Sequence, residues 1–208
     1  MTGRFAPRVL RPEVTARLQF SAMTATVDGA TSGLTRLDHA LLRSTRRALG
    51  STPAVPVAQG LSHFGEHALG WLALGAVGWL SGRRRPEWVA GTAGVVAAHA
   101  AGVVVKRVVR RVRPQLEDVP ALVKTPSRLS FPSVHSCSTA AAAVGFGPLV
   151  GRLPMAGVTG AMLVSRVLLG VHYPSDVVSG AALGAGAATL VRRRLARLDG
   201  ARLEGRKA

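Results

Sequence analysis

A histidine and an aspartate in the C-terminal third of the sequence could carry out nucleophilic chemistry. His172 precedes Pro174 at an expected corner between two apolar helices, and Asp176 follows it by four residues. A carboxylate that accepts the Nδ1 hydrogen of an imidazole fixes the tautomer and leaves Nε2 as a free nucleophile or base. Arg166 lies within an otherwise apolar helix, where an unpaired charge is costly, so we expect it to point inward and meet an anion. The alternative is a structural clamp between His172 and Asp176.

Several cations gather at the end of another predicted helix, 88–113. Lys106, Arg110 and Arg113 are spaced at i, i+4 and i+7, which would place them on one helical face, and Pro114 should end the helix. Such a face could bind the oxygens of an anionic group. Alternatively, these residues form a positive flank that anchors the helix to lipid headgroups.

The segment 130–135 introduces an Ala-rich helix and could form an anion site. Proline suits the first helical position, and the free amides of the following turn attract anions. Ser133 adds a hydroxyl donor, Val134 an amide, and His135 a group that titrates near neutral pH. Alternatively, Ser133 is an N-cap and His135 merely faces solvent.

The elements that must position these residues are hydrophobic helices. Apolar residues make up 48% of the chain, and 27 Lys and Arg against 10 Asp and Glu give a net charge of +17. Apolar runs rich in Ala and Gly cover 61–80, 88–105, 137–151, 154–171 and 177–191. A soluble helical core would also tolerate these lengths, but five helices apolar on most of their circumference favour an all-α integral membrane bundle of about five transmembrane helices.

The ends of the chain have a different character. The region 1–35 has no sustained apolar period and is predicted to be a disordered basic leader, and 196–208 a basic tail. Leucines at helical spacing among arginines in 34–49 predict an amphipathic helix lying on a membrane face or, equally, a soluble surface helix. Positive charge falls on both expected faces of the membrane, so the orientation stays undecided.

Composition also limits the classes of partner. A nucleic-acid binder would spread Lys and Arg over a solvated face and add aromatic residues for stacking. Here the arginines separate long apolar stretches and only 4% of residues are aromatic, which argues against nucleic acid as a partner. The single cysteine, Cys137, cannot form an internal disulfide and is expected to be a small buried residue. The oligomeric state cannot be inferred from the sequence.

Taken together, the three motifs resemble those of the type 2 phosphatidic acid phosphatase (PAP2) superfamily, which is shared with the vanadium haloperoxidases. The order is Lys-x6-Arg-Pro, Pro-Ser-x-His and Ser-Arg-x5-His-x3-Asp, and the resemblance covers roughly residues 60 to 195. It implies a PAP2-like phosphatase domain over 36–195, as a multi-pass protein of the cell membrane. One departure is Val134, which stands where the family usually has glycine.

The resemblance also implies a role for each matched residue. His172 would be the nucleophile, Asp176 its orienting partner, and His135 the acid for the leaving group. The phosphate oxygens would be bound by Lys106, Arg113, Ser133, the amide of Val134, and Arg166. The implied reaction is hydrolysis of a lipid phosphomonoester through a phosphohistidine, without a metal or any other cofactor.

The segments 61–67 and 130–135 resemble an actinobacterial branch of the superfamily, whose members are implicated in dephosphorylating decaprenylphosphoryl-5-phosphoribose during arabinan precursor synthesis. Undecaprenyl diphosphate, phosphatidic acid and phosphatidylglycerophosphate are alternative substrates. A haloperoxidase activity is a further alternative, although those enzymes are larger and soluble. From a different class, the chain could be a non-catalytic membrane protein that binds anionic lipid.

A competing pattern is His63-x-x-Glu66-His67, the spacing of a zinc metallopeptidase helix. Zinc would require a third protein ligand, and no matched downstream His or Glu lies outside the phosphatase motifs. We therefore expect no metal site, and expect His63, Glu66, His67 and Arg110 to contact the substrate instead.

Overall fold

The computed structural model describes residues 33–205, with side chains through residue 198. The chain divides into two units, 1–39 and 40–208. Residues 33–39 and 40–49 are helical, so a helix forms where the spacing of leucines predicted one over 34–49. Residues 1–32 of the predicted leader 1–35, and the side chains of 199–208 in the predicted tail 196–208, lie outside what the structure describes.

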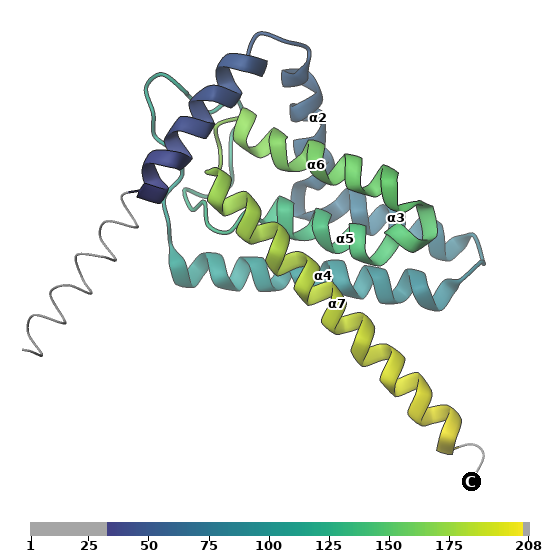
Figure 1. The fold of residues 1–208 in the computed structure, drawn as a ribbon. Helices are drawn as coiled ribbons and strands as arrows, with labels where there is room; N and C mark the ends of the chain where they lie inside the picture. The colour runs from purple at the N-terminus through teal and green to yellow at the C-terminus, as the bar shows by residue number, and fades with distance from the viewer. Residues whose placement is uncertain (1–32, 206–208) are drawn as a thin grey trace, which may run out of the picture. The chain divides into compact units, whose positions relative to one another are not determined.

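The second unit is built from helices that follow one another along the chain (Figure 1). They are α2 (Ala54–Gly65), the short 3-10 helix η1 (Glu66–Ala68), α3 (Leu69–Leu80), α4 (Arg85–Val109), α5 (Val134–Val150), α6 (Arg152–Leu168) and α7 (Pro174–Gly205). Within the described residues, extended pairing is limited to two isolated bridges in the α4–α5 connection. The all-α prediction is confirmed.

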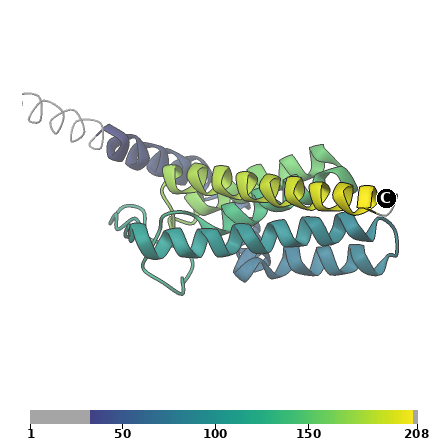
Figure 2. The same cartoon turned by 90° about the horizontal axis from the view of Figure 1, so that it is seen from below.

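Helix α5 lies at the centre of this unit and packs against α4, α6 and α7. Its Ala-rich sequence has no separate polar face, and it contributes the fully buried Phe146 to a core with Trp71 of α3 and Val95 of α4. Helices α4 and α7 also run side by side, as Figure 2 shows. Small residues permit these contacts, because Gly184 of α7 lies directly against the backbone of Cys137 in α5.

Two of the predicted helices are interrupted or end early in the structure, and the one predicted over 177–191 is longer, because α7 runs from Pro174 to Gly205. The predicted helix 61–80 is interrupted at η1, where His67 and Ala68 have φ angles of 50° and 61°. The predicted helix 88–113 ends at Val109, because Arg110 adopts a left-handed conformation with φ 56°. The expectation that Lys106, Arg110 and Arg113 share one helical face is therefore wrong.

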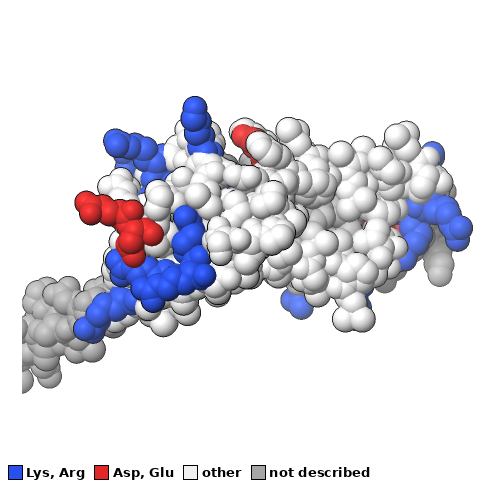
Figure 3. Space-filling view, turned by 90° about the horizontal axis from the view of Figure 1, so that it is seen from above, with Lys and Arg blue, Asp and Glu red and all other residues white. Residues whose placement is uncertain are grey.

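One described helix, α4, is both long and apolar enough to cross a membrane, and α5 is a shorter apolar helix. The predicted number of about five spans stays a prediction. On the face of the bundle shown in Figure 3, Lys and Arg gather toward the two ends, and a broad band of mostly uncharged side chains lies between them. Such a charge distribution suits a bundle that meets water at its two ends and lipid along its sides.

Candidate active site

His172 occupies the corner between α6 and α7, where its side chain is almost completely buried. Gly170, with a φ of 71°, turns the chain after α6, and Pro174 begins α7. The Nε2 atom of His172 lies 3.1 Å from a guanidinium nitrogen of Arg113. A guanidinium can only donate, so Nε2 is the acceptor in this contact and carries a lone pair. That atom is the one a nucleophilic histidine would use.

Arg113 is fixed by the backbone around it. Its guanidinium donates to the carbonyls of Val171 at 2.6 Å and Ser127 at 2.9 Å, as well as facing His172. Burial lowers the pKa of Arg113 to about 10, so it stays charged at neutral pH. Burial, and next the charge of Arg113, hold the pKa of His172 well below its ordinary value of 6.5. The imidazole is therefore neutral at neutral pH, as a nucleophile must be.

Asp176 is held by Arg111 more closely than by His172. Its buried carboxylate accepts a hydrogen bond from Arg111 at 2.9 Å and another from the backbone N–H of Tyr173 at 2.9 Å. The distance from Asp176 Oδ2 to His172 Nδ1 is 3.7 Å, longer than a hydrogen bond. The expected direct bond from Nδ1 to the carboxylate is thus absent in this arrangement, although the two groups are neighbours.

Arg111 was not singled out in the sequence, although it belongs to the cationic run that ends at Pro114. Its guanidinium also donates to Ser175 Oγ at 2.7 Å and lies 4.1 Å above the ring of Tyr173. These contacts tie the connection after α4 to the first turn of α7. Arg111 is therefore placed to position Asp176.

His135 and Arg166 both contact Ser62, a residue that lies outside the three motifs. Ser62, in α2, presents its carbonyl 3.1 Å from His135 Nε2, while its hydroxyl accepts two hydrogen bonds from Arg166 at 3.1 and 3.2 Å. Because a carbonyl only accepts, the hydrogen of His135 is on Nε2. Arg166 is 2% exposed, and its Nε has no hydrogen-bond partner among the described residues. A bound anion would supply one.

Lys106 comes from the last turn of α4. Its ammonium group donates to the carbonyls of Leu129 at 3.0 Å and Ser130 at 2.9 Å. These bonds join the end of α4 to the segment that leads into α5. An ammonium has three donors, so one remains for a ligand.

These side chains surround a cavity of about 640 Å³. The predicted site residues that line it are Lys106, Arg113, Val134, His135, Arg166 and His172, together with His63, Glu66 and His67. Segments far apart in the sequence thus converge on one space that is rich in cations and imidazoles. Such a space suits a ligand with several anionic oxygens.

Three predicted site residues are placed elsewhere. Asp176 lies behind His172, and Arg110 is exposed beside the left-handed end of α4. Ser133 is buried and caps α5, because its hydroxyl accepts from the backbone N–H of Ser136 at 3.4 Å and from the Ser136 hydroxyl at 2.9 Å. The capping role, which the sequence left open as an alternative, is therefore the one its geometry supports.

The zinc pattern does not form the helix it would need. His63 lies in α2, whereas Glu66 and His67 lie in η1, where the left-handed φ of His67 breaks the helical register. The two imidazoles therefore do not share a face of one continuous helix. Across residues 33–198, no cluster of three His, Cys, Asp or Glu side chains is arranged to hold a metal ion.

Comparison with known proteins shows similar sequences and folds. The chain is 50% identical over 147 residues to decaprenylphosphoryl-5-phosphoribose phosphatase of Mycolicibacterium smegmatis, a match that covers 70% of this chain and 82% of that protein. It is 48% identical over 155 residues to the protein of the same name from Mycobacterium tuberculosis, covering 73% and 87%.

Among solved structures, a transmembrane PAP2 type phosphatidylglycerolphosphate phosphatase from Bacillus subtilis gives a TM-score of 0.66 at 24% identity, covering 86% of this chain and 93% of that one. LpxE of Aquifex aeolicus gives 0.62 at 21% identity, covering 76% and 95%. These two likenesses concern the fold. The sequence profile of the PAP2 superfamily matches residues 68–198, which include the three phosphatase motifs. The chain therefore belongs to the PAP2 superfamily.

Proposed function

We propose that this chain is a membrane lipid phosphatase that removes a phosphomonoester by way of a phosphohistidine on His172, without a metal. The observation that carries the proposal is the pairing of a neutral, buried His172 with Arg113 at the wall of a cationic cavity. The relatives that match most of the chain are named phosphatases, which supports the same reaction class.

Binding of the phosphate would use charges that are already fixed. Arg113 and Lys106 are anchored by backbone carbonyls and Arg166 by Ser62, so they need little reorganisation when the substrate arrives. Helix α5 begins at Val134. The amide of Val134 lies in the first turn, where N–H groups have no partner within the helix. Three cations and a helix start would stabilise the charge that spreads over the phosphoryl oxygens in the transition state.

In the first step, the lone pair of His172 Nε2 would attack phosphorus and form the P–N bond as the P–O ester bond breaks. The leaving alkoxide would take a proton from His135. In the free protein the hydrogen of His135 is on Nε2, bonded to Ser62, and the incoming negative charge would favour a second proton on Nδ1. In the second step, water would give its proton to His135 and attack phosphorus, which breaks the P–N bond and releases inorganic phosphate.

The proposed substrate is decaprenylphosphoryl-5-phosphoribose, an intermediate of cell-wall arabinan precursor synthesis, after the relatives of that name. Polar side chains at one side of the cavity, His63, Glu66 and His67, would contact the hydroxyl groups of the ribose. A carboxylate and two imidazoles offer both donors and acceptors to such groups. Undecaprenyl diphosphate, phosphatidic acid and phosphatidylglycerophosphate are the substrates against which this preference must be measured.

We place the phosphatase domain over 36–195 of a multi-pass protein of the cell membrane, with about five spans. Support comes from the length and composition of α4, the apolar α5, and the mostly uncharged band between the basic ends of the bundle (Figure 3). The region 1–35 would be a basic leader and 196–208 a basic tail.

The decisive experiment measures phosphate release from these four lipids in detergent, using the wild type and His172→Ala. We expect a preference for the phosphoribose lipid, and a loss of turnover of at least about a thousandfold in His172→Ala, since the covalent step would be removed. Arg128→Gln is the matched control, because Arg128 is exposed and lies outside the cavity lining.

Chelator should leave turnover unchanged. Full activity in His172→Ala would overturn the mechanism, and equal rates on all four lipids would overturn the proposed specificity. If no lipid is hydrolysed but anionic lipids are retained, the protein is a binding protein rather than an enzyme.

A further inference from the structure

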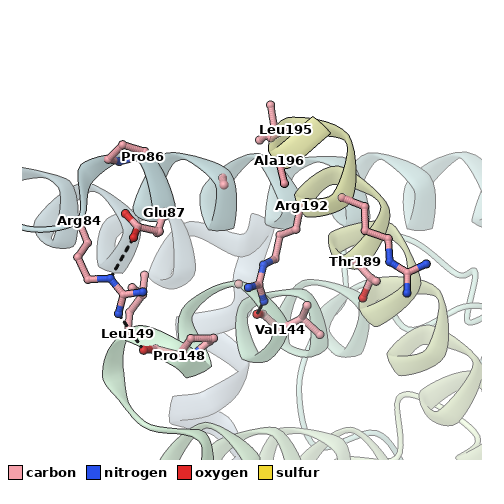
Figure 4. Close-up of a pocket in the computed structure, with 13 residues that line it drawn as sticks. Arg84, Pro86, Glu87, Val144, Pro148, Leu149, Thr189, Arg192, Leu195 and Ala196 are labelled. Carbon is pink, nitrogen blue, oxygen red and sulfur yellow. Dashed lines mark hydrogen bonds and ion pairs between the residues drawn. The ribbon is translucent and has the colours of Figure 1, made fainter. Parts of the chain in front are cut away.

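A second cavity lies between α4, α5 and α7, away from His172. It has a volume of about 470 Å³ and lies among the start of α4, the end of α5 and the stretch 189–196 of α7 (Figure 4). None of the motif residues lines it. The proposed reaction therefore gives this cavity no role.

Arginines dominate the charged groups of this cavity. Arg84, Arg192 and Arg193 line it together with a single carboxylate, Glu87. Arg84 is paired with Glu87 at 3.1 Å, so the two other guanidinium groups leave an excess of positive charge. Arg193 makes no hydrogen bond or ion pair with the described residues, and its side chain is exposed. This side chain is available to an anion.

The position of Arg192 is explained by Pro148 in α5. Pro148 has no N–H, so the carbonyl of Val144 loses its partner within the helix. Arg192 donates to that carbonyl at 2.7 Å, which fixes the guanidinium at the edge of the cavity (Figure 4). A guanidinium has five N–H donors, so most of them remain for a ligand.

Apart from Thr189, the remaining residues that line the cavity are apolar. They include Ala90, Val144, Leu149, Leu195 and Ala196. A ligand that fits must therefore combine an anionic group with hydrocarbon. A free inorganic ion would meet the arginines but would leave the apolar walls uncovered.

The length of α4 places this cavity at a membrane boundary. From Glu87 to Lys106 the helix rises by about 29 Å, close to the thickness of the hydrocarbon core of a bilayer. If Lys106 lies at one boundary, Glu87 lies at the other. At the same end of α4, the guanidinium of Arg85 lies 4.9 Å over the half-exposed ring of Trp79, and tryptophan and arginine are typical of the membrane–water interface.

We propose that this cavity binds an anionic phospholipid from the leaflet opposite the active-site cavity. The headgroup phosphate contacts Arg192 and Arg193, and the upper part of an acyl chain lies against Leu149 and Leu195. Basic pockets between membrane helices bind anionic headgroups through this combination of charge and apolar contact. The inference depends on α4 crossing the membrane and not on the reaction at His172.

The test is native mass spectrometry of the full-length protein in detergent, titrated with phosphatidylglycerol or with phosphatidylcholine of the same acyl chains. The wild type should retain phosphatidylglycerol preferentially. Arg193→Gln should weaken that binding roughly fivefold, and the double variant with Arg192→Gln by a further factor of about five. Arg194→Gln is the matched control, because Arg194 is exposed on the same helix and does not line the cavity.

Arg192→Gln could disturb α5 by freeing the Val144 carbonyl, so Arg193→Gln is the decisive variant. Unchanged phosphatidylglycerol binding in Arg193→Gln would overturn the proposal, as would an equal loss in Arg194→Gln. Displacement of the lipid by millimolar inorganic phosphate would show that the site takes the free ion rather than the lipid.

Discussion

At the scale of the residue, Arg111 lies outside the family's three motifs but binds the motif residue Asp176. Asp176 is fully buried, and its charge is balanced by Arg111, whose side chain is partly exposed. Leaving a buried carboxylate without its partner costs about 3 kcal/mol or more in comparable pairs. Arg111 does not line the active-site cavity, so it would act on the reaction only by positioning Asp176 behind His172.

We therefore expect Arg111→Met to lower kcat about tenfold or more while KM changes little, and to lower the melting temperature in detergent. Arg111→Lys should restore part of both losses, because it keeps a positive charge near the carboxylate. Arg110→Gln, at the exposed neighbouring position, should behave like the wild type. A rise in KM with unchanged kcat would show that Arg111 binds substrate directly, contrary to this assignment.

The depressed pKa of His172 predicts how stability depends on pH. In the unfolded chain this histidine takes up a proton as the pH falls below about 6.5, whereas in the folded protein it stays neutral to a much lower pH. The unfolded state then binds more protons, so His172 contributes stability at pH 7 that is lost on acidification, at up to about 1.4 kcal/mol per pH unit.

The measurement compares melting temperatures in detergent between pH 7 and pH 5 for the wild type and His172→Gln. The wild type should lose more stability over this interval, because glutamine does not titrate. Parallel curves for the two proteins would mean that the imidazole can be protonated in the folded state.

The sequence motifs predict residues that line the cavity, but not the contacts that hold their side chains in place. The resemblance to the PAP2 motifs predicts site roles for Lys106, His135 and His172, and all three line the cavity. Ser62 was not predicted, because its contact with Arg166 joins residues 104 positions apart and depends on the packing of α2 against α6. No local pattern encodes such a contact.

At the scale of the element, the apolar runs predicted that helices would form but not all of their ends. The break at His67 and Ala68 uses left-handed φ angles at residues that are not glycine, as does the end of α4 at Arg110. Such conformations are unfavourable locally and persist only where the surrounding structure determines them. By contrast, Pro174 at the start of α7 and the cap at Ser133 carry local signals, and both were usable from the sequence.

The crossing of α5 and α7 depends on Gly184. A methyl group added there would clash with the backbone carbonyl of Cys137, whereas one added at Gly186 would meet nothing within 4 Å. We expect Gly184→Ala to destabilise the protein by about 1–3 kcal/mol, since backbone cannot move aside as a flexible side chain can. Gly186→Ala, on the same helix, is the control and should be neutral or slightly stabilising. Melting temperatures in detergent compare the two, and equal values would contradict the close approach of the helices.

At the scale of the whole molecule, composition and the length of apolar runs predicted an all-α protein, and the observed helices agree. The number of membrane spans follows less directly, because α3 and α6 are short and α2 is separated from α3 by η1. Among the described helices, length and apolar composition together identify a span only in α4. Whether α4 itself crosses the bilayer can be tested directly at its two ends.

Cysteine accessibility in sealed vesicles would measure which ends of the molecule face which side. Arg83, before α4, and Arg128, after it, are both exposed. The native Cys137 is fully buried, so it should give little background labelling with a membrane-impermeant maleimide. If α4 spans the bilayer, Arg83→Cys and Arg128→Cys must react from opposite sides, and both must react once detergent opens the vesicles. Labelling of both from one side in intact vesicles would mean that α4 does not cross, and would remove the basis for a lipid site in the opposite leaflet.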